Sequence, residues 1–265
     1  MQALTLIKIG GNVIDDPEAL AAFLQSYARV PGLKVLVHGG GKIASTIGIK
    51  LGIAPKMAQG RRITDEETLD VVTMVYAGLV NKRIVSKLQA EGVNALGLTG
   101  ADGNIIPAAK RPVKTIDYGF AGDIEAGQIG SGPLSALLEN GLFPVIAPIT
   151  HDGKGQLLNT NADTIAAAVA ESLSSRYAVT LVYCFEKKGV LKDPEDEESV
   201  IFAINPESYA ELKEKGIVSK GMIPKLDNAF AALKGGVKQV HICRAADLEK
   251  IMEGEAYIST RLEPA

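Results

Sequence analysis

Two apolar runs near the N-terminus each end in consecutive glycines and lead into an amphipathic segment. The first run is LTLIKI (residues 4–9), followed by GGN, and the second is KVLVH (residues 34–38), followed by GGGK. Strands buried in a parallel sheet appear as short, nearly continuous apolar runs, and each pair of such strands needs a crossover segment, usually a helix. The pattern therefore predicts a β-α-β-α order and an α/β fold with a parallel sheet.

The same alternation continues to the end of the chain. Further strands are expected at 94–99, 143–149, 179–185 and 237–243, and helices at 17–29, 43–51, 65–91, 133–140, 161–173, 206–215, 223–234 and 246–252. Residues 55–64 predict a short hairpin or loop, and residues 101–130 predict antiparallel hairpins. We expect an open αβα sandwich around a mainly parallel sheet, with two lobes that share this sheet and meet between residues 159 and 174.

Composition and charge exclude several classes of function. The chain has 265 residues, of which 46% are hydrophobic and 22% charged, and its net charge is -3. This balance favours neither disorder nor a nucleic-acid or anionic-membrane partner. Cys184 and Cys243 each lie in an apolar run, where a free thiol behaves as a small buried hydrophobe. No signal peptide or membrane span is recognisable, so we expect a cytoplasmic protein.

The two glycine turns are candidate anion sites. Gly10 and Gly11 follow the first strand, and Gly40 and Gly41 follow the second. Each turn precedes a predicted helix, so each can direct free N–H groups and the positive end of a helix dipole at an anion. Neighbouring parallel strands would place both turns at one sheet edge. Neither turn matches a P-loop or a dinucleotide fingerprint, and a flexible turn remains the alternative for the glycine triplet.

Two lysines strengthen the prediction of an anion site. Lys8 lies in an apolar strand, where a lysine is costly unless it meets an anion. The alternative is that Lys8 reaches solvent from an edge strand. Lys225 stands at the start of an apolar-periodic helix, where it could reach a phosphate or be an ordinary surface lysine. His38 is expected to support the glycine turn rather than to transfer a proton.

The segment NTNAD (residues 159–163) carries two amides and a carboxylate. Asn161 is a plausible helix N-cap, with Asp163 in the first helical turn, and this alone accounts for NAD. It does not account for Asn159. An asparagine both donates and accepts hydrogen bonds, so Asn159 could orient a ligand that carries an amide and carboxylates.

Together these segments resemble the amino-acid kinase family. The resemblance rests on KIGGN (8–12), VHGGGK (37–42), GRRIT (60–64), LLENGLFPVIAPI (137–149), NTNAD (159–163) and GMIPK (221–225). Each motif is short, but their order and spacing extend over nearly the whole chain. Within the family, the similarity points to the members that use ATP to phosphorylate the γ-carboxylate of N-acetyl-L-glutamate in arginine synthesis.

The resemblance implies a separate role for each of the two lobes. Residues 1–160 would form a lobe that binds the acylated amino acid and dimerises, and residues 161–265 a lobe that binds ATP. The implied site residues are Lys8, Asp163 and Lys225 for catalysis, Lys8, Gly10, Gly11 and Lys225 for the nucleotide, and Gly40, Gly41, Arg62 and Asn159 for the acylglutamate. Asp163 would organise the two lysines rather than act as a base. Mg²⁺ would arrive with the nucleotide, so no metal ligand is assigned.

Some residues depart from the family pattern. Glu186 stands where the family usually has an aspartate, which leaves the adenine and ribose contacts around residues 184–191 open. Arg61 precedes Arg62, so either could hold the substrate; the spacing to Thr64 favours Arg62. Lys8 lies close to the N-terminus, whereas arginine-inhibited relatives carry an additional N-terminal helix, and this predicts an arginine-insensitive homodimer.

Alternative functions remain open. The acyl group could be succinyl, as in a variant arginine pathway, rather than acetyl. Other family members act on free glutamate, aspartate, carbamate or UMP, and NTNAD together with GRRIT argues against these substrates. A non-catalytic sensor could keep the fold without turnover, although the presence of Lys8, Asp163 and Lys225 favours an enzyme.

Overall fold

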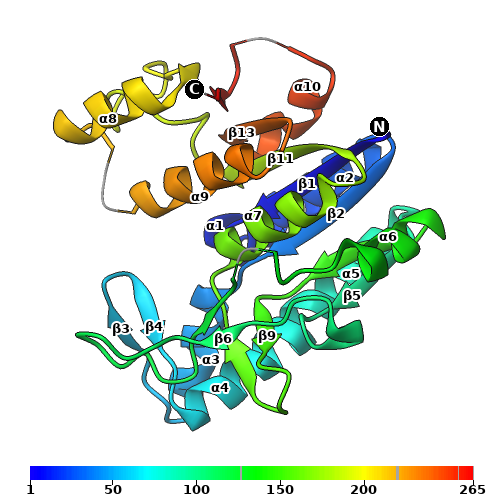
Figure 1. Ribbon diagram of the computed structural model, residues 1–265, viewed down its shortest axis with the longest axis vertical. Coiled ribbons are helices and arrows are strands. Elements are labelled where there is room, and N and C mark those ends of the chain that lie inside the picture. Colours follow the sequence, from blue (N-terminus) through cyan, green and yellow to red (C-terminus); the bar gives the residue numbers. More distant parts are fainter. Residues whose placement is uncertain (126, 219–220, 256, 265) are drawn as a thin grey trace.

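An eight-stranded sheet runs through the centre of the computed structural model, which describes residues 1–125, 127–218, 221–255 and 257–264 (Figure 1). The strand order is β12-β14-β13-β11-β1-β2-β8-β5. The strands are β1 (Ala3–Ile9), β2 (Leu33–His38), β5 (Ala95–Leu98), β8 (Phe143–Ile146), β11 (Ala178–Phe185), β12 (Ala203–Ile204), β13 (Gln239–Arg244) and β14 (Thr260–Leu262). Among these described strands only the β13–β14 pair is antiparallel, which confirms the predicted mainly parallel sheet.

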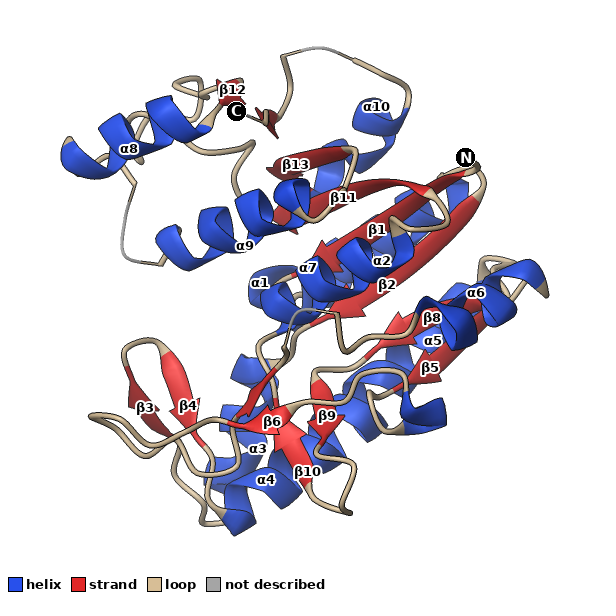
Figure 2. Ribbon diagram, viewed as in Figure 1, coloured by secondary structure: helices blue, strands red, loops and turns tan. Residues whose placement is uncertain are grey.

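Helices cover both faces of the sheet, as Figure 2 shows. One face packs against α6 (Ser131–Glu139), α7 (Ala162–Leu173) and α9 (Ile223–Lys234), and the other against α2 (Pro17–Arg29), α5 (Asn81–Ala90) and α10 (Leu248–Met252). Because side chains alternate along a strand, Leu4 and Leu6 of β1 belong to the first core and Ile7 and Ile9 to the second. Burial on both faces explains the continuous apolar run of β1.

Short hairpins lie beyond the carboxyl ends of β1 and β2 (Figure 1). They pair β3 (Lys56–Ala58) with β4 (Arg61–Ile63), β6 (Ala109–Lys110) with β7 (Gly122–Asp123), and β9 (Ile149–His151) with β10 (Leu157–Asn159). The antiparallel structure predicted for 55–64 and 101–130 is therefore confirmed, except that residue 126 lies outside the described residues. The remaining helices are α1 (Gly11–Asp15), α3 (Gly41–Lys50), α4 (Glu66–Thr73) and α8 (Pro206–Glu214), with 3₁₀ turns at Asp102–Asn104 and Ala245–Asp247.

Helix α2 illustrates how local sequence sets the boundaries of an element. The side chain of Asp16 accepts hydrogen bonds from the N–H groups of Glu18 (2.8 Å) and Ala19 (3.1 Å), and Pro17 occupies the first helical position. At the other end, Lys34 Nζ donates to carbonyl oxygens of the last turn, including that of Val30 at 2.9 Å. These caps fix the helix at the predicted residues 17–29.

Two predictions need correction. The strand predicted for 143–149 is confirmed at its start but is shorter than predicted, because β8 ends at Ile146 and Ile149 already begins β9. Pro148 lies between them, and proline cannot donate a ladder hydrogen bond. The helix predicted for 65–91 is helical throughout, but its middle, Met74–Val80, is π-helical between α4 and α5. None of the described helices is long and apolar enough to cross a membrane.

Candidate active site

The two glycine turns lie side by side, as their place after adjacent strands predicts. β1 and β2 are parallel neighbours, and Ile9 is paired with His38 at their carboxyl ends. The N–H of Gly39 donates to the carbonyl of Ile9 at 3.2 Å, which ties the second turn to the first. Gly10 is the N-cap of α1, and Gly41 is the first residue of α3. Both turns can therefore present N–H groups at one edge of the sheet.

Gly40 must be glycine for two reasons. Its φ angle is +148°, outside the range that other residues adopt readily, and an added Cβ would lie 3.2 Å from Cδ1 of Tyr76. Tyr76 comes from the π-helical segment and forms a wall under the turn. The sequence analysis did not single out Tyr76, because its place in the helical period is sufficient to explain it.

His38 supports the second glycine turn, as expected. Its Nδ1 lies 2.7 Å from the carbonyl oxygen of Gly39, and its Nε2 lies 3.1 Å from the amide nitrogen of Asn81. An amide nitrogen can only donate, so Nε2 accepts and Nδ1 carries the proton. Complete burial lowers the pKa of His38 to about 4, and the imidazole is neutral near pH 7.

A buried cluster of three charged groups lies beside the first glycine turn. Lys8 Nζ is 2.7 Å from Oδ1 of Asp163, and Lys225 Nζ is 3.6 Å from Oδ2 of the same carboxylate. Lys8 is only 5% exposed, in a strand that has neighbours on both sides, so the alternative of an edge-strand lysine is wrong. An added Cβ on Gly10 would lie 3.4 Å from Lys8 Nζ, so that ammonium group faces the turn.

The cluster carries one more positive than negative charge. Burial on its own would raise the pKa of Asp163, but the ammonium groups of Lys8 and Lys225 outweigh this effect and hold the pKa below its usual value. Burial lowers the pKa of Lys225, and the nearby Lys8 lowers it further, whereas Asp163 opposes the shift. Two lysines against one carboxylate leave a net positive charge, which an additional anion would neutralise.

Two aromatic residues at the end of β11 hold this cluster. Lys225 Nζ lies 3.7 Å and Lys8 Nζ 5.2 Å from the centroid of the Phe185 ring, within the range of cation–π attraction. The Tyr183 hydroxyl donates to the carbonyl oxygen of Asp163 at 3.1 Å. The sequence reasoning missed Phe185. The only available signal was its position at the carboxyl end of a predicted strand.

Helix α7 presents Asp163 at its first turn. Asn161 is the N-cap, and its side-chain oxygen accepts from the N–H groups of Asp163 (2.8 Å) and Thr164 (3.1 Å). The capping function predicted for Asn161 is thus confirmed. It coexists with the ion pairs of Asp163, because the cap uses the backbone N–H of that residue and leaves its carboxylate free.

A cavity of about 230 Å³ reaches Ala162, the chain neighbour of Asp163, and is lined among others by Gly40, Gly41, Arg62 and Asn159. Arg62 Nη2 donates to the carbonyl oxygen of Gly41 and to the hydroxyl of Ser45, both at 2.8 Å. Asn159 donates from Nδ2 to the hydroxyl of Thr64 at 3.0 Å. All four residues predicted for the acylglutamate therefore line one cavity, which we call the substrate pocket after that prediction.

A second cavity of about 300 Å³ lies on the C-terminal side, and Lys225 is part of its wall. Its lining is mainly apolar and includes Phe185, Val190 and Met222, with Glu186 at the position where the resemblance leads one to expect an aspartate. Such a slot suits a planar heteroaromatic group. We call this cavity the nucleotide pocket after the role that the resemblance implies for Lys225. Lys225 thus belongs both to its wall and to the charged cluster.

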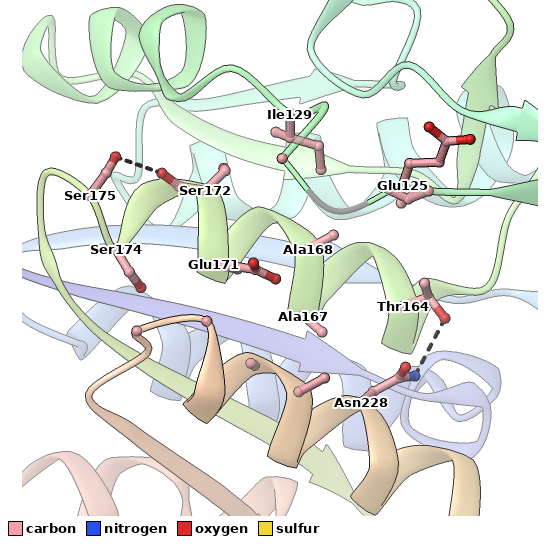
Figure 3. Close-up of a pocket in the computed structure, with 16 residues that line it drawn as sticks. Glu125, Ile129, Thr164, Ala167, Ala168, Glu171, Ser172, Ser174, Ser175 and Asn228 are labelled. Carbon is pink, nitrogen blue, oxygen red and sulfur yellow. Dashed lines mark hydrogen bonds between the residues drawn. The ribbon is translucent and has the colours of Figure 1, made fainter.

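A larger cavity, about 470 Å³, contains none of the predicted site residues (Figure 3). It runs along α7 and α9, with small residues such as Ala167 and Ala168 on its floor. Its polar groups are largely engaged within the protein. For example, Ser174 donates to the carbonyl oxygen of Ala170 at 2.8 Å, and Asn228 donates to Thr164 at 3.4 Å. We therefore do not assign the reaction to it.

Lys42 lies apart from the charged cluster. Its side chain is 71% exposed, and its Nζ is 3.9 Å from Oδ2 of Asp15, in agreement with a helix-start residue. Within the described residues, no group of three or more histidine, cysteine or acidic side chains is arranged to hold a metal ion.

Comparison with known proteins identifies the family. The model of the amino acid kinase family matches residues 3–244. The chain belongs to the amino acid kinase family. This membership agrees with the mainly parallel sheet flanked by helices. Solved structures of other proteins extend the likeness in fold to the whole chain.

Individual relatives are similar over nearly their full length. An acetylglutamate kinase from Cytophaga hutchinsonii is 55% identical to this chain over 263 residues. The alignment covers 99% of this chain and 99% of the relative. An acetylglutamate kinase from Phocaeicola vulgatus is 55% identical over 249 residues, covering 94% and 96% of the two chains. N-acetylglutamate synthase from Neisseria gonorrhoeae, solved with coenzyme A and N-acetyl-glutamate, has a TM-score of 0.80 at 24% identity, covering 98% of this chain and 59% of the other. At that identity the likeness concerns the fold alone.

Proposed function

We propose that this protein is an acetylglutamate kinase, which transfers the γ-phosphoryl group of ATP to the γ-carboxylate of N-acetyl-L-glutamate in the second step of arginine biosynthesis. The observation that carries the proposal is the buried Lys8–Asp163–Lys225 cluster with its surplus positive charge. Lys225 lines the nucleotide pocket, and Ala162, the chain neighbour of Asp163, lines the substrate pocket. The names of the curated relatives agree with this function.

The chemistry requires no general base. A glutamate side-chain carboxyl has a reference pKa of about 4.3, so the nucleophile is ionised near neutral pH. One carboxylate oxygen forms a bond to the γ-phosphorus while the bond from that phosphorus to the bridging oxygen of ADP breaks, and the products are an acyl phosphate and ADP. Both reactants are anions. Catalysis is then mainly positioning and neutralisation of charge.

Each predicted site residue has a place in this scheme. Lys8 and Lys225 neutralise charge on the transferring phosphoryl group, and Asp163 holds the two ammonium groups in position. The N–H groups at Gly10 and Gly11 contact the nucleotide phosphates. The N–H groups at Gly40 and Gly41 hold the attacking carboxylate, while Arg62 and Asn159 hold the remainder of the acylglutamate. These last four residues line one cavity, which supports the assignment.

Three further proposals accompany this function. Mg²⁺ would arrive with the nucleotide and offset part of the phosphate charge, and no residue of the chain is assigned as its ligand. Residues 1–160 act as the substrate lobe and residues 161–265 as the ATP lobe. The protein works in the cytoplasm as a homodimer, which light scattering during size-exclusion chromatography would test.

A substrate panel tests the proposed function. The purified protein is incubated with MgATP, hydroxylamine and one of four acceptors, namely N-acetylglutamate, N-succinylglutamate, free glutamate and aspartate. We expect equal amounts of hydroxamate and ADP with N-acetylglutamate and only background with the two free amino acids. Ligand binding without turnover of any acceptor would instead identify a non-catalytic sensor and exclude the proposal.

A further inference from the structure

The hydroxyl of Tyr76 reaches the substrate pocket from a side chain that is otherwise buried. Tyr76 is 5% exposed, and its ring belongs to the same core as Ile7 and Ile9 of β1. Tyr76 nevertheless lines the substrate pocket. Because a tyrosine combines an apolar ring with a polar tip, burial of the ring leaves the hydroxyl as the part that can meet a ligand.

The ring of Tyr76 runs along the second glycine turn. A Cβ added at Gly40 would lie 3.2 Å from Cδ1 and 3.4 Å from Cε1 of this ring, and a Cβ added at Gly41 would lie 3.8 Å from the hydroxyl oxygen. The ring edge therefore lies next to Gly40, and the hydroxyl lies next to Gly41, where α3 begins. Because neither glycine has a side chain, the hydroxyl can approach the turn closely.

The start of α3 offers N–H groups that need an acceptor. The first N–H groups of a helix have no partner within the helix, and Gly40, as the N-cap, has no side-chain oxygen to accept from them. The hydroxyl of Tyr76 lies beside these groups. An anionic oxygen bound at this turn would therefore meet both backbone N–H donors and the Tyr76 hydroxyl.

The hydroxyl of Tyr76 keeps its proton and can donate it. Burial raises the pKa of Tyr76, although the positive charge of Arg62 and a hydrogen bond from that side chain oppose the shift. A guanidinium only donates, so the hydroxyl oxygen accepts from Arg62 and its proton remains for another acceptor. The hydroxyl groups of Tyr183 and Tyr209 donate to protein oxygens at 3.1 and 2.8 Å, whereas Tyr76 has no such acceptor in the parts of the chain that the structure describes.

We propose that the Tyr76 hydroxyl donates a hydrogen bond to the γ-carboxylate of the acylglutamate, at the oxygen that does not attack. An ionised carboxylate has about four lone-pair sites, so this hydroxyl and the N–H groups at Gly40 and Gly41 can bind it together. The hydrogen bond directs the other oxygen toward the γ-phosphorus. The oxygen bound by Tyr76 becomes the carbonyl oxygen of the acyl phosphate, and the proton stays on Tyr76. This inference rests on the proposed function, since it concerns the nucleophile of the same reaction.

The test removes the hydroxyl and keeps the ring. In the wild type, Tyr76→Phe and Tyr177→Phe, we would measure kcat and KM for the acylglutamate that the wild type phosphorylates, and KM for ATP. Tyr177 is the matched control, because it is also 5% exposed, its hydroxyl has no partner within the described residues, and it lies outside the substrate and nucleotide pockets. Loss of a hydrogen bond to a charged group predicts that Tyr76→Phe lowers kcat/KM for the acylglutamate about 10–100-fold and changes KM for ATP less than about threefold. Tyr177→Phe should behave as wild type.

A truncated ligand separates this contact from a merely structural role of Tyr76. N-acyl-L-2-aminobutyrate, with the same acyl group as the substrate, keeps the α-carboxylate and lacks the γ-carboxylate. In calorimetric competition, its dissociation constant should differ less than about threefold between wild type and Tyr76→Phe, whereas that of the acylglutamate should rise at least about tenfold in the variant. Equal weakening of both ligands would show that Tyr76 only supports the turn, and it would overturn the inference.

Two further outcomes decide between this inference and the proposed function. A value of kcat/KM within about threefold of wild type in Tyr76→Phe would overturn the inference and leave the proposed function intact. If the wild type phosphorylates none of the acceptors, the proposed function fails, and calorimetric titration with N-acetylglutamate decides the inference separately. Binding that weakens in Tyr76→Phe but not in Tyr177→Phe then supports the hydroxyl contact. Equal binding to both variants, or no binding to the wild type, overturns it.

Discussion

Replacing Asp163 by asparagine removes the charge that holds the catalytic lysines while preserving the shape of the side chain. Asp163 is 8% exposed and contacts Lys8 Nζ at 2.7 Å and Lys225 Nζ at 3.6 Å. With an effective dielectric constant of about 20, Coulomb's law gives about 6 and about 5 kcal/mol for these two contacts. Desolvation offsets much of this attraction. We therefore expect the free energy of unfolding to fall by about 3–5 kcal/mol, the usual effect of removing one partner of a buried pair.

The same variant separates binding from catalysis. Without the carboxylate, ATP becomes the counter-anion of both lysines, so the dissociation constant for ATP should stay equal or decrease. The lysines lose their fixed positions, and kcat should fall about 10²–10³-fold, the scale for losing preorganised charge stabilisation. ADP release in a coupled assay measures kcat, and urea denaturation measures stability. Glu211→Gln is the matched control, because it removes an exposed ion pair with Lys215, which contributes at most about 1 kcal/mol.

The pH dependence gives a further check on Asp163. Folding lowers the pKa of Asp163 below its ordinary value of 3.8. Its ionised form therefore stabilises the folded protein fully above pH 3.8, and this stabilisation is lost as the pH falls through the folded-state pKa. The difference in unfolding free energy between wild type and Asp163→Asn should therefore be constant near neutral pH and shrink in acid. A variant that keeps kcat within about threefold of wild type would refute the assigned role of Asp163.

Three other substitutions test the surroundings of the cluster. Gly40→Ala should lower the free energy of unfolding by about 1–3 kcal/mol in urea titrations, because the new Cβ would lie 3.2 Å from Tyr76 and the φ angle of residue 40 is +148°. Gly78→Ala is the control, and it should not destabilise the protein, because nothing lies within 4 Å of its new Cβ. Arg62→Gln should raise KM for N-acetylglutamate about 10–100-fold with a smaller effect on kcat, measured by hydroxamate formation. Burial lowers the pKa of His38 from 6.5 to about 4, so the unfolded chain takes up this proton at a higher pH than the folded protein. As the pH falls from 6.5 to 4, the free energy of unfolding should therefore decrease by up to about 3 kcal/mol. His38→Gln should reduce that decrease. An unchanged pH dependence of the unfolding free energy in this variant would contradict the prediction for His38.

The sheet and its main helices could be predicted because their signals are local. The apolar run at residues 4–9 is buried on both faces, and α2 has both a capping aspartate and a proline at its first position. Three other short elements could not be predicted. Helix α1 has only five residues, too few to show a helical period, and β12 and β14 have two and three.

The charged residues of the candidate site could be predicted from the sequence, but the aromatic residues that pack against them and against the second glycine turn could not. A lysine in a buried strand contradicts ordinary burial preferences, so Lys8 attracts attention in the sequence. Asp163 in a first helical turn does not, and its role came from the family resemblance. Tyr76 and Phe185 satisfy those preferences and carry no such signal. Their place under Gly40 and beside Lys225 depends on how distant elements pack.

The most direct test of the central claim is the turnover number of Lys8→Ala with MgATP and N-acetylglutamate. Lys8 is the buried cation between the first glycine turn and Asp163, and its removal takes away one preorganised charge-stabilising donor. We predict that kcat falls at least about 10²-fold, while N-acetylglutamate still binds in calorimetric titrations. Turnover preserved near the wild-type value would remove Lys8 from the mechanism and contradict the assignment of the cluster.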